Sequence, residues 1–124
     1  MSALPKIVAV VEDDASMLKG IERLLGTLGL TTELYLSAEA YLNVAAESAA
    51  NCLLLDIHLP GMSGIELKRR LVASGSRLPI IFMSSSEDER TQQEAIATGC
   101  VAYLQKPFIS SALIHALSRA ASSP

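Results

Sequence analysis

The sequence of 124 residues contains no tryptophan, few other aromatic residues and a modest number of basic side chains. Its ten lysine and arginine residues are outnumbered by thirteen acidic residues, so the formal net charge is −3. The only basic run, Lys68-Arg69-Arg70, falls in a helical pattern and is predicted to be a solvated helix face. This distribution of charge argues against direct binding of nucleic acid by the chain.

Cysteine is scarce as well, and long apolar runs are absent. Cys52 and Cys100 lie singly in or beside apolar runs, without the paired spacing of metal or redox sites, so both are predicted to be buried thiols. No apolar run approaches the roughly 20 residues of a membrane span, and the first residues lead into a strand pattern too quickly for a signal peptide. We expect a soluble, cytoplasmic protein without membrane contact.

Hydrophobic residues nevertheless make up half of the chain, which is ample for a packed core. A length of 124 residues favours one domain over two. We therefore expect residues 1–124 to form a single domain, with its core at about 5–120 and with 120–124 as a tail or the start of a linker.

Short apolar runs alternate with helical patterns five times along the chain. Residues 7–11, 52–55 and 80–83 are apolar without a break, which is typical of parallel strands buried on both faces. Residues 32–36 alternate between polar and apolar side chains and residues 101–104 form a short run, so both are predicted to be edge strands. The alternation predicts an α/β fold, a doubly wound (βα)5 domain with a parallel sheet.

Several residues indicate where the helices begin and which side they bury. The predicted caps are Asp14, Ser37, Ser63 with Glu66, Ser86 with Glu89 and, at a helix end, Gly99. The first helix is predicted to bury Met17, Ile21, Leu24, Leu25 and Leu28. The last helix is predicted to bury Ile109, Leu113, Ala116, Leu117 and Ala120.

Acids, hydroxyls and one lysine directly follow the predicted strands. Glu12 and Asp13 follow the first apolar run, Asp56 the third, Ser84 the fourth and Lys106 the fifth. In an open parallel sheet, ligand sites form beyond the carboxyl ends of the strands, which gather at one edge. We therefore expect these side chains to meet in one site.

Carboxylates that meet in such a site require a compensating cation. Packed closely, Glu12, Asp13 and Asp56 would repel and raise each other's pKa. Their oxygens are the ligands that Mg²⁺ prefers, and Mn²⁺ is a second candidate. Lys106 adds a compact positive charge that can pair with Asp56 or with a phosphoryl oxygen. The Asp56 carboxylate could then attack phosphorus and form an acyl phosphate that water can hydrolyse.

Four segments together resemble a known family. They are Val11-Glu12-Asp13-Asp14, Asp56-Ile57-His58-Leu59-Pro60-Gly61-Met62-Ser63-Gly64, Ser84-Ser85 and Lys106-Pro107-Phe108. In order and separation they resemble the receiver domains of two-component response regulators, over nearly the whole chain. The resemblance implies a flavodoxin-like three-layer sandwich whose five-stranded parallel sheet has the strand order 2-1-3-4-5.

The resemblance also implies a role for each residue of the site. Asp56 would be the phosphoacceptor and a metal ligand. Asp13 would bind Mg²⁺ directly, Glu12 would assist through water, and His58 would offer its backbone carbonyl. Lys106 would contact the phosphoryl group.

A switch is implied by the same resemblance. Ser84 would move to hydrogen-bond a phosphoryl oxygen and Tyr103 would fill the space it leaves, which would change the surface of the fourth helix, fifth strand and fifth helix. Ser85 and Ser86 would modulate the site, and the peptide bond before Pro107 would be cis. The other interpretation of Tyr103 is an edge-strand aromatic that leaves its hydroxyl in water.

Three positions depart from the commonest family pattern. Glu12 replaces an aspartate, and its longer side chain would shift the metal geometry slightly. Ser84 retains the hydroxyl that threonine frequently supplies. His58 either tunes hydrolysis of the acyl phosphate or is an exposed loop residue whose side chain has no role.

The resemblance further implies partners. A histidine kinase or a phosphotransfer protein would donate the phosphoryl group, and an output domain or protein would receive the signal. Residues 37–42, Ser-Ala-Glu-Ala-Tyr-Leu, resemble receivers that precede helix-turn-helix transcription factors, so control of transcription is one expected output. Formation of a homodimer on phosphorylation is a further expected interaction. The chain would catalyse only its own phosphorylation and dephosphorylation.

Other functions remain open at this point. A phosphatase of the haloacid dehalogenase kind needs a second aspartate two residues after the nucleophile, where this chain has His58, and a cap domain. A flavodoxin-like nucleotide binder would place phosphate at the first loop, where Glu12, Asp13 and Asp14 would repel it. A stand-alone module would signal through phosphorylation-dependent protein contacts, and a pseudo-receiver would mediate contacts without an intact site.

Overall fold

Strands and helices alternate throughout residues 3–122, the part of the chain that this computed structural model describes. The strands are β1 (Ile7–Val11), β2 (Thr31–Tyr35), β3 (Cys52–Asp56), β4 (Ile80–Ser84) and β5 (Ala102–Gln105). The helices are α1 (Ala15–Thr27), α2 (Ala38–Val44), the 3-10 turn η1 (Ala45–Glu47), α3 (Gly64–Ala73), α4 (Glu89–Ala97) and α5 (Ser110–Ala121). The ends of the expected domain and tail, residues 1–2 and 123–124, lie outside the described residues.

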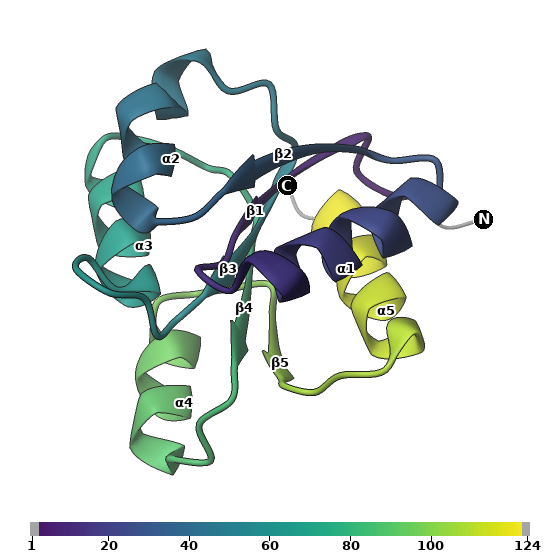
Figure 1. Cartoon of the computed structure of the whole chain (residues 1–124). Helices are drawn as coiled ribbons and strands as arrows, with labels where there is room; N and C mark the ends of the chain where they lie inside the picture. The colour runs from purple at the N-terminus through teal and green to yellow at the C-terminus, as the bar shows by residue number, and fades with distance from the viewer. Residues whose placement is uncertain (1–2, 123–124) are drawn as a thin grey trace.

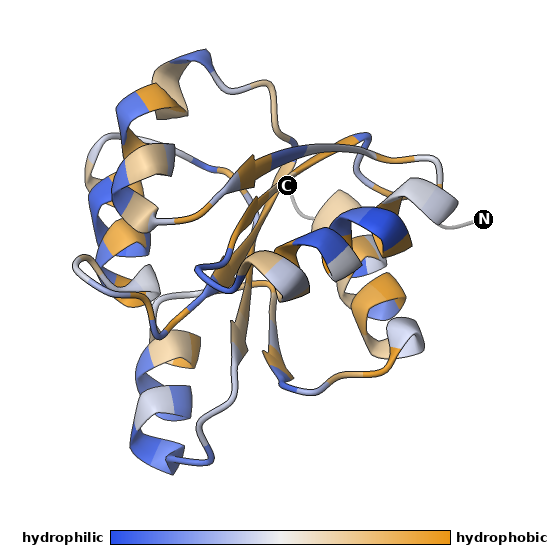
Figure 2. Cartoon of the chain, in the orientation of Figure 1, coloured by the Kyte–Doolittle hydropathy of each residue, from blue (hydrophilic) through white to orange (hydrophobic). Residues whose placement is uncertain are grey.

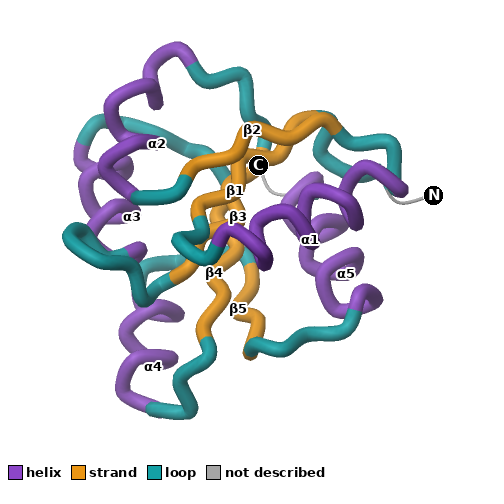
Figure 3. The backbone as a smooth tube through the Cα atoms, in the orientation of Figure 1, coloured by secondary structure: helices purple, strands orange, loops and turns teal. Residues whose placement is uncertain are grey.

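All five strands are parallel and pair in the order β2-β1-β3-β4-β5. Helices α1 and α5 cover one face of the sheet, and α2, α3 and α4 cover the other (Figure 1). Figure 3 shows the same three layers, with the strands in the middle. The predicted doubly wound, flavodoxin-like (βα)5 fold and its strand order are therefore confirmed.

The central strands divide their side chains between two hydrophobic cores. Val8 and Val10 of β1 belong to the core under α1 and α5, whereas Ala9 and Val11 belong to the core under α2, α3 and α4. Successive strand residues point to opposite faces, which explains why these strands are apolar without a break. Figure 2 shows the hydrophobic residues concentrated along them. Among the helices of residues 3–122, none combines the length and hydrophobicity that a bilayer crossing requires.

Three of the predicted helix caps are confirmed. The Asp14 carboxylate accepts hydrogen bonds from the backbone N–H groups of Ser16 and Met17, at 2.9 and 3.1 Å. Ser37 caps α2 and Ser63 caps α3, each accepting a bond from the N–H three residues later. These side chains satisfy amides that the first helical turn leaves without partners.

The predicted cap of α4 is wrong. Asp88, and not Ser86, caps this helix, since its carboxylate accepts a hydrogen bond from the N–H of Arg90 at 3.0 Å. Ser86 instead accepts a bond from the N–H of Asp88 at 3.1 Å. Glu89 is therefore the first residue of the helix and stands too early to complete a capping box. The correction places the start of α4 two residues beyond the expected position.

Two predictions of burial also need correction. Ile109 is 71% exposed because α5 begins only at Ser110, although the other predicted residues of that helix face are buried. On α1, Leu18 is buried and was missed, whereas Met17, Leu24 and Leu28 are only half-buried. The edge strands are each shifted by one residue from their expected positions, and Leu36 lies outside β2 with 55% of its surface exposed.

The two cysteines differ. Cys52, in β3, is fully buried, and burial raises the pKa of its thiol to about 12. Cys100, just before β5, is only half-buried, and burial raises its pKa as well. The prediction of buried thiols thus holds for Cys52 and only in part for Cys100.

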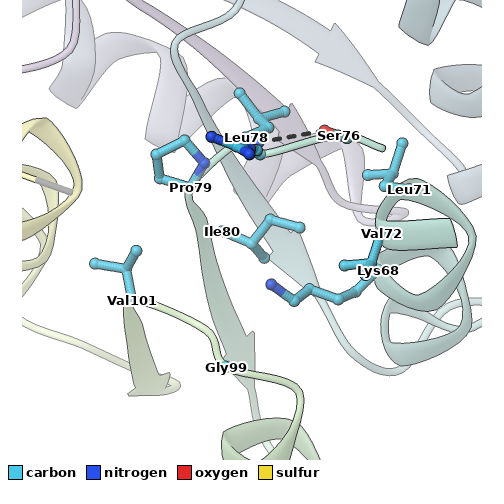
Figure 4. Close-up of a pocket in the computed structure, with 10 residues that line it drawn as sticks. Lys68, Leu71, Val72, Ser76, Leu78, Pro79, Ile80, Gly99 and Val101 are labelled. Carbon is cyan, nitrogen blue, oxygen red and sulfur yellow. Dashed lines mark hydrogen bonds between the residues drawn. The ribbon is translucent and has the colours of Figure 1, made fainter. Parts of the chain in front are cut away.

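The basic run on α3 is solvated only in part. Arg69 and Arg70 are exposed and form ion pairs with Glu94 and Glu66, at 3.3 and 3.1 Å. Lys68 is only 8% exposed, so the prediction of a solvated face is wrong for this residue. Its side chain extends from α3 toward the amino ends of β4 and β5 and lines a cavity of about 110 Å³ (Figure 4). Burial lowers the pKa of Lys68.

Candidate functional site

The predicted site residues come together at the carboxyl edge of the sheet. Asp56 is the last residue of β3 and Ser84 the last residue of β4, while Glu12 and Lys106 directly follow β1 and β5. The strands are in parallel register, with Val11 opposite Leu55 and the strand ends therefore at similar height. The topology thus brings together residues that are up to 94 positions apart in the sequence.

Three acids form a compact cluster of oxygen donors. One carboxylate oxygen from each of Glu12, Asp13 and Asp56 lies within 4.8 Å of the others. Glu12 and Asp56 are 1% and 4% exposed, whereas Asp13 is exposed to solvent. Acids this close repel each other unless a cation compensates them. An all-carboxylate donor set that is open on one side suits a hard divalent ion such as Mg²⁺, which keeps some of its own water ligands.

Lys106 compensates part of this charge. Its Nζ donates hydrogen bonds to Oδ2 of Asp56 at 2.9 Å and to Oε1 of Glu12 at 2.5 Å. Burial acts to lower the pKa of Lys106, but the hydrogen bonds and charges of Glu12 and Asp56 raise it above its ordinary value. The contact with Asp56 was expected. The contact with Glu12 was not, since β1 and β5 are separated by two strands and nothing in the local sequence signals it.

Backbone amides hold the second oxygen of each buried acid. The N–H of His58 donates to Oδ1 of Asp56 at 3.1 Å, and the N–H of Asp14 donates to Oε2 of Glu12 at 3.2 Å. Each carboxylate is therefore held by one lysine bond and one amide bond two residues along the chain. This arrangement fixes the orientation of both acids.

The loop between β3 and α3 passes close to Asp56. A Cβ at Gly64 would lie 2.3 Å from the Asp56 carbonyl oxygen, so only glycine allows this approach. The N–H of Gly64 also donates to the carbonyl of Ile57 at 3.0 Å. Gly61, in the middle of the loop, has a φ of +74°, which likewise favours glycine. The side chain of His58 is exposed.

The three serines at the end of β4 differ in burial and in hydrogen bonding. Ser84 is fully buried, and its hydroxyl accepts a hydrogen bond from the N–H of Ser86 at 3.0 Å. Its carbonyl accepts a bond from the N–H of Lys106 at 2.8 Å, which ties the ends of β4 and β5 together. Ser85 is exposed and Ser86 is half-buried. The peptide bond between Lys106 and Pro107 is cis, as the resemblance implied.

Tyr103 lies in β5 opposite Phe82 of β4. The residue is half-buried and packs against the core under α2, α3 and α4. Its hydroxyl is buried and has no hydrogen-bond partner within residues 3–122. This contradicts the interpretation in which the hydroxyl stays in water. An unpaired buried hydroxyl is costly, so this side chain is not in its most favourable polar environment.

Comparison with known proteins identifies the family. The family model of the response regulator receiver domain matches residues 8–118. Response regulator protein TodT of Pseudomonas putida is 35% identical over 120 residues, which cover 97% of this chain and 53% of TodT. Transcriptional regulatory protein FixJ of Bradyrhizobium diazoefficiens is 35% identical over 101 residues, covering 82% of this chain and 49% of FixJ. The chain thus spans about half the length of these curated relatives.

Solved structures agree with this match. The crystal structure of FixJ-N superposes with a TM-score of 0.89 at 30% identity, covering 100% of this chain and 98% of that one. A response regulator receiver protein from Burkholderia phymatum superposes with a TM-score of 0.82 at 35% identity, covering 95% and 96% of the two chains. The fold, the acidic cluster and the sequence match together show that this chain belongs to the response regulator receiver domain family.

Proposed function

We propose that Asp56 accepts a phosphoryl group from a histidine kinase or a phosphotransfer protein, in a reaction that requires Mg²⁺. The observation that carries this proposal is the pairing of two buried acids with one lysine. Lys106 bonds to both Glu12 and Asp56, and Asp13 completes the cluster on the exposed side. A purely structural ion pair would need only one acid beside the lysine, whereas here two buried acids share Lys106 and a third lies next to them.

The donor atoms at the site are of the kind that a hard divalent ion prefers. Glu12, Asp13 and Asp56 supply hard oxygen donors, and the carbonyl of His58 would add a neutral one. When bound, Mg²⁺ or Mn²⁺ would supply positive charge that offsets the negative charge of the phosphoryl oxygens. As in the receiver family, Asp13 and Asp56 would bind the ion directly and Glu12 would assist through water.

The residues of this chain perform the transfer mainly by positioning. An oxygen of Asp56 forms the bond to phosphorus while the bond from phosphorus to the donor nitrogen breaks, and the donor imidazole leaves with the electron pair. The His58 amide and the Lys106 ammonium hold the Asp56 carboxylate in orientation. Lys106 can then shift its bond from Asp56 to a phosphoryl oxygen. Hydrolysis of the acyl phosphate reverses the state, so the chain catalyses only its own modification.

We further propose that Ser84 and Tyr103 convert phosphorylation into a change of shape. Ser84 stands at the end of β4 with a hydroxyl that can turn from the Ser86 amide to a phosphoryl oxygen. The buried, unpaired hydroxyl of Tyr103 supports a second arrangement of this side chain with a lower cost. The surface of α4, β5 and α5 would change with it.

The output remains a proposal drawn from relatives. FixJ is named a transcriptional regulatory protein, and this chain spans about half of its length. We propose that phosphorylation controls an output domain or protein, with transcription as the favoured process, and that a phosphorylated homodimer is one form of the signal.

Phosphorylation is tested by intact-protein mass spectrometry with phosphoramidate and Mg²⁺. The wild-type chain should gain the mass of one phosphoryl group, and Asp56→Asn should gain none while its circular dichroism stays native. Glu22→Gln is the matched control, because Glu22 lies on α1 outside the acidic cluster and pairs with Lys19, and this variant should be labelled normally. Stoichiometric labelling of Asp56→Asn would show that another residue is the acceptor.

The switch is tested by backbone chemical shifts with and without beryllofluoride. Residues around Ser84 and Tyr103 should shift in the wild-type chain, and Ser84→Ala should reduce the shift at Tyr103. Identical spectra with and without the mimic, in a chain that binds it, would exclude the switch.

A further inference from the structure

Within the segment Ser37–Leu42, the side chain of Glu39 neither caps α2 nor is buried in the core. Ser37 caps α2, and Ala38 and Tyr41 are buried in the core. Glu39 instead reaches away from α2, and its Oε2 accepts a hydrogen bond from the backbone N–H of Met62 at 2.9 Å. Met62 lies 23 residues further along, in the loop between β3 and α3. A carboxylate of α2 therefore holds the loop that begins at Asp56.

Gly61 shows how closely the carboxylate approaches this loop. A Cβ at position 61 would lie 2.3 Å from Oε2 of Glu39. The φ of Gly61 is +74°, so the backbone turns at the point where the carboxylate covers it. The hydrogen bond from Met62 lowers the pKa of Glu39, and the charge of Arg70 acts in the same direction. Glu39 is thus ionised at neutral pH while its Oε2 accepts the bond from Met62.

The rest of this loop has few anchors. Its first end is held by the bond from the His58 amide to Asp56, and its last end by the bond from Gly64 to Ile57. Between these ends, Glu39 is the only side chain from outside the loop, among residues 3–122, that hydrogen-bonds a loop amide. The carbonyl of His58 belongs to this span, so its direction depends on how the loop is held.

We propose that Glu39 is a positioning residue, which holds the loop between β3 and α3 so that the carbonyl of His58 faces the acidic cluster. This inference rests on the proposed function, since it concerns the same metal site. Glu39 itself does not touch the site. Its loss should let the loop sample other conformations and weaken Mg²⁺ binding, as loss of an outer partner does at other metal sites.

Three substitutions of Glu39 separate the effect of where its acceptor oxygen lies from the effect of its charge. Glu39→Ala removes the acceptor, and Glu39→Asp keeps the charge but withdraws it by one methylene group. Glu39→Gln keeps an acceptor oxygen at the same reach without the charge. By calorimetric titration with Mg²⁺ alone, we expect the Ala and Asp variants to bind about tenfold more weakly, and the Gln variant to stay close to wild type.

A matched control and a metal-free measurement complete the test. Ser37→Ala weakens α2 by removing its cap but keeps the Glu39 carboxylate that accepts the bond from Met62, so its Mg²⁺ affinity should stay closer to wild type than that of Glu39→Ala. Without metal, hydrogen exchange of the Met62 amide should be faster in the Ala and Asp variants than in the wild type and the Gln variant.

The outcomes separate this inference from the proposed function. Wild-type affinity in Glu39→Ala and Glu39→Asp would overturn the role of Glu39 and leave the metal site standing. Equal loss of affinity in Ser37→Ala would show a general effect of α2 stability and would also overturn it. Failure of the wild-type chain to bind Mg²⁺ would overturn both.

Discussion

Lys106 and Lys68 are two lysines near opposite ends of the sheet, and both are withdrawn from water. The Lys106 side chain is 13% exposed and bonds to two carboxylates, whereas Lys68 is 8% exposed and has no ion pair or hydrogen bond within residues 3–122. The pKa of Lys106 is raised and that of Lys68 is lowered. Burial acts in the same direction on both, so the partners alone account for the difference.

The two lysines differ in what surrounds them. Lys106 pairs with two acids of the candidate site, whereas Lys68 has no partner of opposite charge within residues 3–122. Lys106 offsets repulsion between Glu12 and Asp56, and in the proposed reaction it would transfer its bond to an incoming phosphoryl group. Lys68 offsets nothing, and its ammonium is accommodated beside the cavity that lies between α3 and the amino ends of β4 and β5 (Figure 4). Withdrawing a charge from water is costly, and a hydrogen-bonded partner of opposite charge offsets at least part of that cost.

The largest expected effect is that of Lys106→Met. It leaves Glu12 and Asp56 buried side by side without a cation and should lower the free energy of unfolding by about 2–3 kcal/mol at neutral pH in the presence of a chelator. Urea unfolding measures this loss. Adding Mg²⁺ should restore part of the stability, because the ion supplies the missing charge. A stability equal to wild type in the chelator would contradict the compensating role of Lys106.

Lys68→Met should have the opposite sign. It replaces a largely buried lysine that has no ion pair within residues 3–122 with an apolar side chain of similar length, and it should raise the free energy of unfolding by up to about 1 kcal/mol. Lys19→Met on the exposed face of α1 is the control and should change stability by less than about 0.5 kcal/mol. If Lys68→Met destabilised the fold, the ammonium would have a favourable partner after all.

The two lysines should also differ in their dependence on pH. The pKa of Lys68 in the folded chain lies below the ordinary value of 10.5, so the unfolded chain binds more protons in that window and wild-type stability rises with pH there. The advantage of Lys68→Met should therefore shrink as pH approaches 10.5. The pKa of Lys106 lies above 10.5, so the deficit of Lys106→Met should persist throughout that range.

These two trends are measured by urea unfolding of all three chains between pH 7 and about pH 10. Parallel curves for the wild type and Lys68→Met would show that the Lys68 pKa is not lowered by burial.

The smallest effect is expected next to Lys68, at Arg69. Its ion pair with Glu94 is 3.3 Å long, and the two side chains are 57% and 48% exposed. Arg69→Ala should therefore change the free energy of unfolding by no more than about 0.5 kcal/mol. A cost above 1.5 kcal/mol would mean that this pair fastens α3 to α4 more firmly than its exposure indicates.

Local patterns in the sequence were sufficient for most of the fold. The unbroken apolar runs predicted β1, β3 and β4, because a strand covered on both faces needs apolar side chains at every position. Asp14, Ser37 and Ser63 were recognised as caps, because the bond each one makes lies within three residues. Asp88 was missed because Ser86 offered an equally good local pattern.

By itself, the sequence determined the order of the elements and placed an acid, a hydroxyl or a lysine after each strand of the site. The tertiary structure decided that Lys106 meets Glu12, that Glu39 reaches Met62, that Lys68 is buried and that the Tyr103 hydroxyl is unpaired. The physical reason is the sequence separation between the residues that interact. Periodicity and caps are fixed by neighbours within a turn, whereas burial and contacts between distant segments depend on how the layers pack.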